Sequence, residues 1–487
     1  MMASWISVLL VMCVFLFFSV WLGTRGYSNL RRSTADHVVA GHSLGFLAIF
    51  FISVSEFYSA NTFLGAPGWA YEHGVAVLNG SMVGLLALLV MYWLGPRVQA
   101  VGKKLNLLTQ AHFLRTRFSS ELLGGLAAVV ALCALIPYIS VQIMGAGYVF
   151  NVVTDGHVPF WLGGLAAYGV VAIYVFRGGL RGIGYIAVFK GIFMLVMIVV
   201  LATIVVHRNY GNPREMFRQI ALESPKNLTL PGAQNFFGYT WWTTSVLNGM
   251  CGYFMWPHLF SNFYAAQDGR VIKRMAIATP VYTLLDFIII IIGFAGILIV
   301  KNLTRPDQIM MRMVMNSGLP VLLVGLIAAA ALSASMVAGA ALTLTATATL
   351  GNDLMQKHLR LSDSSLKRLM QYLVFVIIGL AYLFSISVVS TLQYIMLMAY
   401  GVISQFFPLA VASLYWKRCT ATGAIAGLLA GSIVAIFLTV GPYPHPHDIH
   451  PGIIGMLTNA AILVVVSLKS DPPSNQVIES FFPEGST

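Results

Sequence analysis

Long apolar segments recur along this chain from its first residues to residue 468, and most of them are close to the length of a membrane span. An α-helix needs about 20 apolar residues to cross a bilayer, whereas a transmembrane β-strand needs only about 10 residues of alternating polarity. Charged residues make up 9% of the 487 residues, against about a quarter in a soluble globular domain. The sequence therefore predicts an all-α polytopic membrane protein and argues against a soluble fold or a β-barrel.

We expect about 13 transmembrane helices. The segments, numbered below in this order, are residues 4–22, 44–72, 76–95, 120–153, 158–176, 184–206, 239–264, 276–300, 318–350, 369–387, 389–416, 420–441 and 452–468. No small-residue cleavage site follows the first segment, so it is expected to be a retained helix instead of a signal peptide.

The basic residues predict the orientation of the chain. Most of the 28 Lys and Arg residues lie in alternate loops, at residues 23–43, 96–118, 177–183, 265–275, 351–368 and 417–419, or in the tail. Short loops rich in Lys and Arg stay in the cytoplasm, so we expect the N-terminus outside and the C-terminus inside, in a bacterial plasma membrane. The same placement accounts for the net charge of +12 without a nucleic-acid partner.

Two segments carry residues that interrupt a helix. Residues 52–74 read ISVSEFYSANTFLGAPGWAYEHG, and the segment five spans later has Gly249, Gly252 and Pro257 near its middle. Paired interruptions of this kind are typical of inverted-repeat transporters, where unwound backbone surrounds a binding site near the membrane midplane. Two ordinary kinked helices are the alternative, because Gly and Pro are common in membrane helices.

Several motifs resemble one family. AGHSLG at 40–45 and SANTFLGAPGWAYEHG at 59–74 resemble the second helix of the sodium:solute symporter family, and GYFMWPHLFSNFYAAQD at 252–268 resembles its seventh helix. Arg177-Gly178-Gly179-Leu180 resembles the turn into helix 6, and residues 407–431 resemble the junction of helices 11 and 12. The matches fall in the family's order.

The resemblance implies a LeuT-type core of ten helices in two inverted repeats, here segments 2–6 and 7–11. The organisation would be a first helix and loop (1–43), two five-helix repeats (44–206 and 239–416), two C-terminal helices (417–468) and a cytoplasmic tail (469–487). It also implies a secondary transporter that imports a small organic solute by alternating access, with no enzymatic activity and no cofactor besides a coupling ion, Na⁺ or H⁺.

In family members, backbone carbonyls of helix 2 and paired hydroxyls of helix 9 hold sodium, because hard oxygen ligands suit a small cation. On this chain the helix 2 carbonyls fall at Ser55 and Tyr58, and Ala334 supplies the carbonyl of helix 9. In the register that the resemblance implies, the paired hydroxyls are replaced by Val337 and Ala338. Ser333 and Ser335 lie close, but they would need a register shift and are alternatively bonded to their own helix. The metal-binding expectation is thus limited to a sodium site that has lost part of its donor set.

Helix 6 departs from the family pattern as well. Ala187 stands where the pattern has Asp, and Lys190 stands where it has Gln. The two positions share a helix face, so the Lys190 ammonium is expected either to reach the sodium site and couple transport to protons, or to snorkel or pair with Glu56. Sodium coupling through another arrangement stays open. Glu56 is alternatively a proton carrier, and Asp286 is expected to make a structural hydrogen bond.

The resemblance also suggests a solute site of polar and aromatic side chains. Its expected members are Ser59, Asn61, Thr62, Gln142, Tyr253, Phe254, Trp256 and His258. EFYSANTF at 56–63 and VFK at 188–190 partly resemble the monocarboxylate permease branch, so a monocarboxylate or an amino acid is the expected solute. His258 is equally well explained as a brace for the broken helix.

A transporter-like membrane sensor that passes a ligand signal to a partner protein is the competing function. The lipid bilayer and a small solute are the expected partners, and the sequence leaves the oligomeric state open. We find no catalytic constellation, nucleotide motif or metal-ligand cluster in the sequence.

Overall fold

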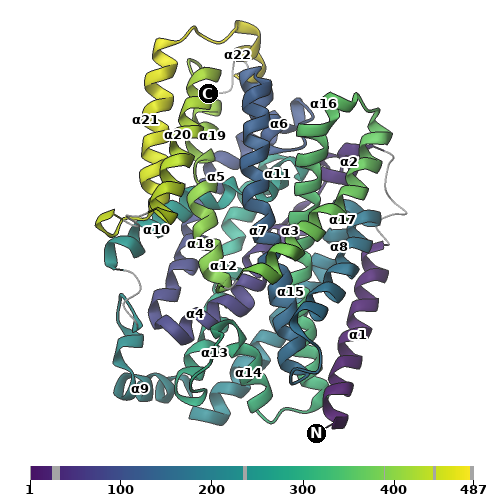
Figure 1. Ribbon diagram of the computed structural model, residues 1–487, viewed down its shortest axis with the longest axis vertical. Helices are drawn as coiled ribbons and strands as arrows, with labels where there is room; N and C mark the ends of the chain where they lie inside the picture. The colour runs from purple at the N-terminus through teal and green to yellow at the C-terminus, as the bar shows by residue number, and fades with distance from the viewer. Residues whose placement is uncertain (1, 25–32, 234–237, 389, 442–445, 483–487) are drawn as a thin grey trace.

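The computed structural model describes residues 2–24, 33–233, 238–388, 390–441 and 446–482, without the side chains of residues 2–4, 55, 56, 357, 440 and 480. This part of the chain is a bundle of helices with no β-strand (Figure 1). The helices are α1 (Met2–Thr24), α2 (Thr34–Val39), α3 (Phe46–Phe57), η3 (Asn61–Gly65), α4 (Ala66–His73), η4 (Gly74–Val77), α5 (Leu78–Lys104), α6 (Gln110–Phe118), α7 (Glu121–Val153), α8 (Phe160–Tyr210), α9 (Pro213–Glu223), η5 (Pro225–Leu228), α10 (Tyr239–Gly252), η7 (Tyr253–Met255), α11 (Pro257–Ala265), α12 (Gly269–Thr283), α13 (Leu285–Ile299), η8 (Pro306–Gln308), α14 (Ile309–Asn316), α15 (Val321–Ala348), η9 (Thr349–Met355), α16 (Gln356–Leu359), α17 (Asp363–Ser387), α18 (Leu392–Ile403), α19 (Phe406–Tyr415), α20 (Ala421–Val440), η10 (Pro446–Asp448), α21 (Pro451–Lys469) and α22 (Asn475–Phe481).

The helices confirm the prediction of an all-α polytopic membrane protein. Ten helical stretches within the described ranges are long and apolar enough to cross a membrane. One of them, α8, contains two predicted segments because Gly179, at φ 53° and ψ −155°, breaks the helix between them. Another joins α4 to α5, and α10 with α11 forms a further, broken span. With these breaks counted, the described helices match the predicted segments in order.

Helix α15 lies at the centre of the bundle because its side chains are small. Its sequence from residue 328 is AAAALSASMVAGAA, and residues of this size let neighbouring helices approach closely. It packs against α7 and α8, and 78% of its apolar window is buried, the largest share among the ten stretches found in the described residues. Helices α20 and α21 pack as a pair at one edge of the bundle, and α1 lies at the opposite edge (Figure 1).

Both interrupted segments are broken helices, as the Gly and Pro residues predict. Helix α3 ends at Phe57, Tyr58 leaves helical geometry at φ −118° and ψ 55°, and the chain resumes as the π-helical turn η3. Helix α10 ends at Gly252, and Trp256 is extended at φ −56° and ψ 128° before Pro257 opens α11. Pro257 favours this second break because the residue before a proline avoids helical geometry.

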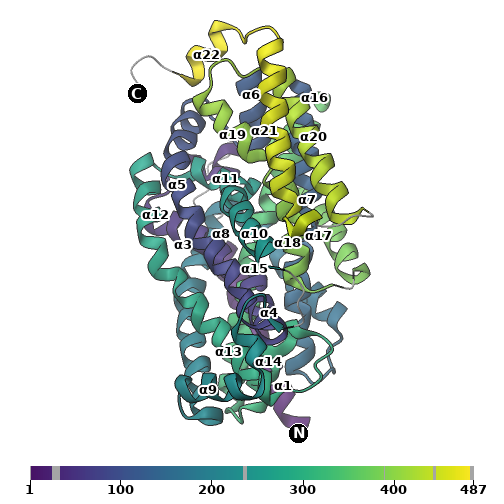
Figure 2. The ribbon, with the colours of Figure 1, turned by 90° about the vertical axis from the view of Figure 1, so that its left-hand side faces the viewer.

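The bundle has two opposite ends, and α1 starts at one end while α22 lies at the other (Figure 1). The start of α1 lies at the same end as α9, α13 and α14, and we call this end the α9 face. Helices α2, α6, α16 and α22 lie at the other end, which we call the α6 face (Figures 1 and 2). Which face is cytoplasmic, and the repeat boundaries at 44–206 and 239–416, stay predictions.

Candidate solute and ion site

A cavity lies between the two broken helices. It has an empty volume of about 940 Å³ that includes the open solvent at its mouth. The lining comes from the breaks themselves and from α5, α7, α10, α13 and α18. Its residues are Phe57, Ser59, Asn61, Thr62, Ala66, Val77, Asn79, Gly80, Ser81, Val83, Gly84, Tyr138, Ser245, Asn248, Gly249, Tyr253, Trp256, Leu259, Asp286, Ile290, Gln393, Met396, Leu397, Tyr400 and His450.

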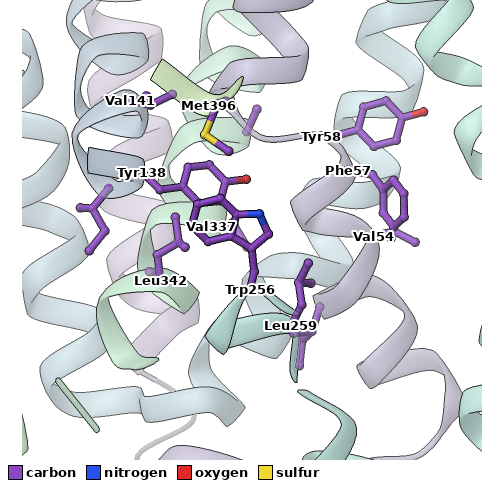
Figure 3. Close-up of a cluster of buried hydrophobic side chains, with 14 of the residues drawn as sticks. Val54, Phe57, Tyr58, Tyr138, Val141, Trp256, Leu259, Val337, Leu342 and Met396 are labelled. Carbon is purple, nitrogen blue, oxygen red and sulfur yellow. The ribbon is translucent and has the colours of Figure 1, made fainter. Parts of the chain in front are cut away.

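Aromatic rings form much of the cavity wall. Tyr138 of α7 and Trp256 lie with ring centroids 4.8 Å apart, and Tyr400 of α18 packs edge-on against Trp256 at 5.6 Å. On the other side, Phe57 stacks on Tyr253 at 4.9 Å. Figure 3 shows Trp256 and Tyr138 beside Met396, with Phe57 across from them. A solute in this cavity therefore contacts ring faces and edges.

Buried acceptor oxygens also border the cavity. Oδ1 of Asn61, of Asn248 and of Asp286 is buried and has no hydrogen-bond partner among the described residues. The other group of Asn248, its Nδ2, donates to the carbonyl of Tyr400 at 3.3 Å. Oδ1 of Asn248 lies against Gly452 of α21, where an added Cβ would clash with it. Buried polar atoms are normally satisfied, so the oxygens of Asn61 and Asp286 are suited to accept hydrogen bonds from a bound solute.

Five of the eight predicted solute-binding residues line the cavity. They are Ser59, Asn61, Thr62, Tyr253 and Trp256. All five belong to the two breaks, where loss of helical geometry turns side chains toward the space between the helices.

The other three predicted residues are held behind the lining. Oε1 of Gln142 accepts the backbone amide of Ala60 at 2.9 Å, which satisfies a donor freed by the break in the helix. Phe254 packs against neighbouring rings at 5.1 and 5.6 Å, and His258 lies 5.8 Å from the ring of Tyr138. His258 thus packs where a brace for the broken helix would lie. A direct role for these three in solute binding stays a prediction.

The predicted ion site brings Lys190 of α8 to α15. Lys190 is 1% exposed, and its Nζ donates to the carbonyl of Ala334 at 3.2 Å. This is the same carbonyl that the family pattern assigns to sodium. Val337 and Ala338, at the positions of the family's hydroxyls, are fully buried, and so is Ala187. At this position an ammonium takes the carbonyl, and residues 337 and 338 carry no hydroxyl. The neighbouring Ser333 has a buried hydroxyl with no hydrogen-bond partner among the described residues, so sodium binding through another arrangement stays a prediction.

The next two carbonyls of α15 are also bound from α8. The hydroxyl of Tyr168 donates to the carbonyl of Ser335 at 3.1 Å, and that of Tyr174 donates to the carbonyl of Met336 at 2.7 Å. Three successive carbonyls of α15 therefore accept hydrogen bonds from α8, and Lys190 is the one cationic donor among these three.

The remaining predicted ion-site residues lie on or next to α3. Tyr58 directs its hydroxyl away from Trp256 (Figure 3), and this hydroxyl donates to the carbonyl of Tyr282 at 2.5 Å. Ser55 and Glu56 belong to the last turns of α3, but their side chains lie outside the described part of the chain. The predicted pairing of Glu56 with Lys190 therefore stays a prediction.

Several lining residues did not follow from the sequence. Asn248, Tyr138 and Tyr400 are polar or aromatic residues within apolar segments, and no local motif distinguishes them. Asp286 carried a usable signal, since an acid inside a membrane span is by default a functional candidate. It was expected to make a structural hydrogen bond, and it does lie within hydrogen-bonding reach of the Tyr58 hydroxyl, but it also lines the cavity.

Comparison with known proteins places these features in context. The model of the sodium:solute symporter family matches residues 37–431. A Bacillus subtilis (strain 168) protein called "Uncharacterized symporter YhjB" is 30% identical over 480 residues, which cover 95% of this chain and 97% of that protein. The sodium/pantothenate symporter of Escherichia coli (strain K12) is 26% identical over 449 residues, covering 89% of this chain and 92% of the symporter.

A relative with a different substrate matches over a shorter stretch. The monocarboxylate transport permease protein of Rhizobium johnstonii is 25% identical over 297 residues, covering 58% of this chain and 59% of the permease. Among solved structures, an outward-open Na⁺-coupled sialic acid symporter superposes with a TM-score of 0.80 at 16% identity. The match covers 96% of this chain and 99% of the symporter. This similarity shows that the fold is shared.

Proposed function

Because this chain belongs to the sodium:solute symporter family, we propose that it imports a small organic solute by alternating access, with Lys190 acting in place of the sodium ion between α3 and α15. Family membership makes it an integral membrane transporter and not an enzyme. The proposed setting is a bacterial plasma membrane with the N-terminus outside. One observation carries the coupling proposal, the 3.2 Å contact between Nζ of Lys190 and the carbonyl of Ala334.

The chemistry of an amine explains how Lys190 would couple transport to protons. The ammonium form donates to the carbonyl and supplies the positive charge that sodium supplies elsewhere. The neutral amine, left after loss of the proton, holds the carbonyl less strongly because a charge-assisted hydrogen bond is stronger than a neutral one. Binding and release of a proton at Nζ would thus tighten and loosen the bridge between α8 and α15 during the transport cycle.

The proposed solute is a monocarboxylate or an amino acid. The cavity combines aromatic rings with hydroxyl and amide groups, a lining suited to a small solute with polar and apolar parts. The name of the Rhizobium relative supports a monocarboxylate, over little more than half of the chain. The resemblance of EFYSANTF and VFK to the monocarboxylate branch supports the same class.

Transport assays with separate ion gradients test the coupling. We expect purified protein in liposomes to accumulate labelled lactate, pyruvate, alanine or proline when a proton gradient is imposed, without sodium. Lys190→Ala should lower gradient-driven accumulation by at least about tenfold while solute exchange continues, because only the coupling step loses its proton-binding group.

Lys226→Ala is the matched control, since Lys226 is exposed in η5 and does not line the cavity. It should transport as the wild type does. Uptake that rises with sodium and ignores pH, or coupling that survives Lys190→Ala, would contradict the role of Lys190. Failure to transport any solute under either gradient would contradict the transporter proposal itself and favour a sensor.

A further inference from the structure

We infer that the transported solute carries a primary or secondary ammonium group, which the carboxylate of Asp286 and the aromatic rings of the cavity receive. The inference rests on the proposed function and narrows its two solute classes to the amino acids and similar amines. It starts from a buried acid in the cavity wall that the coupling proposal does not use.

Asp286 lies in the first turn of α13 and is held at the cavity by its neighbours. It is 7% exposed, its Oδ1 has no hydrogen-bond partner among the described residues, and the hydroxyl of Tyr58 lies within hydrogen-bonding reach of its carboxyl group. Asp286 therefore presents an acceptor oxygen that nothing in the described protein satisfies.

The charges around the cavity are unbalanced. The described lining contains no Lys or Arg, and the one other titratable group besides tyrosines is His450. Nδ1 of His450 accepts the backbone amide of Gly452 at 3.1 Å, so the imidazole is in its neutral form. A buried carboxylate without a cationic partner is costly, and a cationic group on the solute supplies that partner.

The uncharged part of the wall favours the same kind of solute. Ring faces carry negative potential, so the rings of Tyr138, Trp256 and Tyr400 attract an organic cation and repel a carboxylate. The unsatisfied Oδ1 of Asn61 accepts a hydrogen bond, which an ammonium with N–H groups donates and a carboxylate does not. A bare monocarboxylate would also bring a second negative charge beside Asp286.

Binding of matched pairs of small molecules tests the inference on the full chain in nanodiscs. Each pair differs only in the ammonium group: alanine with propionate, proline with cyclopentanecarboxylate, and phenylalanine with 3-phenylpropionate. We expect at least one ammonium compound to bind the wild type with a Kd lower than that of its partner by about tenfold or more. Asp286→Asn, which keeps the shape and removes the charge, should abolish this discrimination.

Asp268→Asn is the matched control, because Asp268 is exposed and caps α12 through the amide of Val271, a bond that Asn also accepts. It should keep the wild-type discrimination. Repeating the titrations in NaCl and in KCl separates a solute ammonium from an alkali cation at Asp286. If Asp286→Asn removes only the dependence of binding on sodium, and the discrimination between paired compounds stays unchanged, the inference is overturned.

Three further results would also overturn it: equal binding of both members of a pair, unchanged discrimination in Asp286→Asn, or no binding of any ammonium compound to the wild type. These outcomes are distinct from failure of the proposed function. Transport of propionate would leave the transporter intact and remove the ammonium requirement. Selective binding of amines without any transport would keep the ammonium requirement and contradict the proposed transport function.

Discussion

Three ionisable side chains lie among apolar residues in this protein, each in a different environment. Lys190 donates to a backbone carbonyl, Asp286 borders the cavity, and Asp307 accepts the backbone amide of Leu392 through Oδ2 at 3.1 Å. Asp307 lies in η8, outside the membrane-spanning helices, and caps the start of α18. It is 3% exposed, and burial raises the pKa of its carboxyl from 3.8 to about 7. Each charge is thus explained by what it touches.

Asp307 predicts a pH dependence of stability. Since its pKa is higher in the folded protein than in the unfolded chain, the folded state binds the extra proton between those two values. The free energy of unfolding should therefore fall as pH rises from about 4 to about 7, and the contribution of Asp307 should level off above that range. Thermal unfolding in detergent across this range measures the effect.

The matched variants isolate this residue from the rest of the protein. Asp307→Asn keeps the acceptor for Leu392 and should flatten the slope relative to the wild type. Asp155→Asn, at an exposed turn position, should leave the slope unchanged. An identical slope in the wild type and Asp307→Asn would contradict the assignment.

At the scale of the helices, glycine breaks set the path of the chain. Gly179 divides α8 at φ 53° and ψ −155°, a conformation that residues with a side chain essentially do not adopt. A Cβ at this position would lie 2.6 Å from the backbone oxygen of His37 in α2. The break therefore depends on a glycine for two separate reasons, its backbone geometry and the close approach of α2.

Gly179→Ala should destabilise the protein by about 2 kcal/mol or more, from the backbone strain together with the displacement of His37. Gly169→Ala is the matched control in the same helix, because nothing lies within 4 Å of a Cβ there. It should be neutral or slightly stabilising, since Ala favours a helix over Gly. Thermal unfolding of the two variants in detergent compares them, and equal midpoints would refute the prediction.

At the scale of the whole molecule, a buried ion pair ties distant elements together near the α6 face. Arg115 of α6 donates to Oδ1 of Asp353 in η9 at 3.0 Å, and Thr109 donates to Oδ2 of the same carboxylate at 2.6 Å. Asp353 is buried, so its pairing with Arg115 is far less screened than an exposed one. This network joins the α6–α7 region to the end of the central helix.

Breaking this pair should shift the protein toward a state open at the α6 face. Arg115→Ala leaves Asp353 buried without its cation, and we expect solute affinity to fall by about tenfold as the competent state is depopulated. Arg218→Ala should have no effect, because the Arg218–Glu215 pair lies at the surface, where ion pairs contribute little. Titration of a bound solute in nanodiscs measures both, and equal affinities would contradict a gating role.

Local sequence signals predicted the fold because they depend on neighbours along the chain. Apolar length predicted the spans, and Gly249, Gly252 and Pro257 predicted the break in segment 7. Segment 2 was also predicted to be interrupted, but its helix breaks at Tyr58, ahead of its Gly and Pro residues. The same breaks predicted Ser59, Asn61, Thr62, Tyr253 and Trp256, all of which line the cavity. For Lys190, the exchange within a family motif predicted a contact with the ion site as one alternative, beside snorkelling or pairing with Glu56, and Nζ donates to the carbonyl of Ala334.

What the sequence determined by itself is therefore the membrane fold, the broken helices and the unusual residue at the ion site. Only the tertiary structure decided which side chains meet in the cavity. Asn248, Asp286 and Tyr400 come from three different helices, α10, α13 and α18, and all line the cavity. Gln142 does not line it, because its side chain accepts the backbone amide of Ala60. The physical reason is that helical periodicity and breaks are local, whereas the face a membrane helix turns inward depends on the helices packed around it.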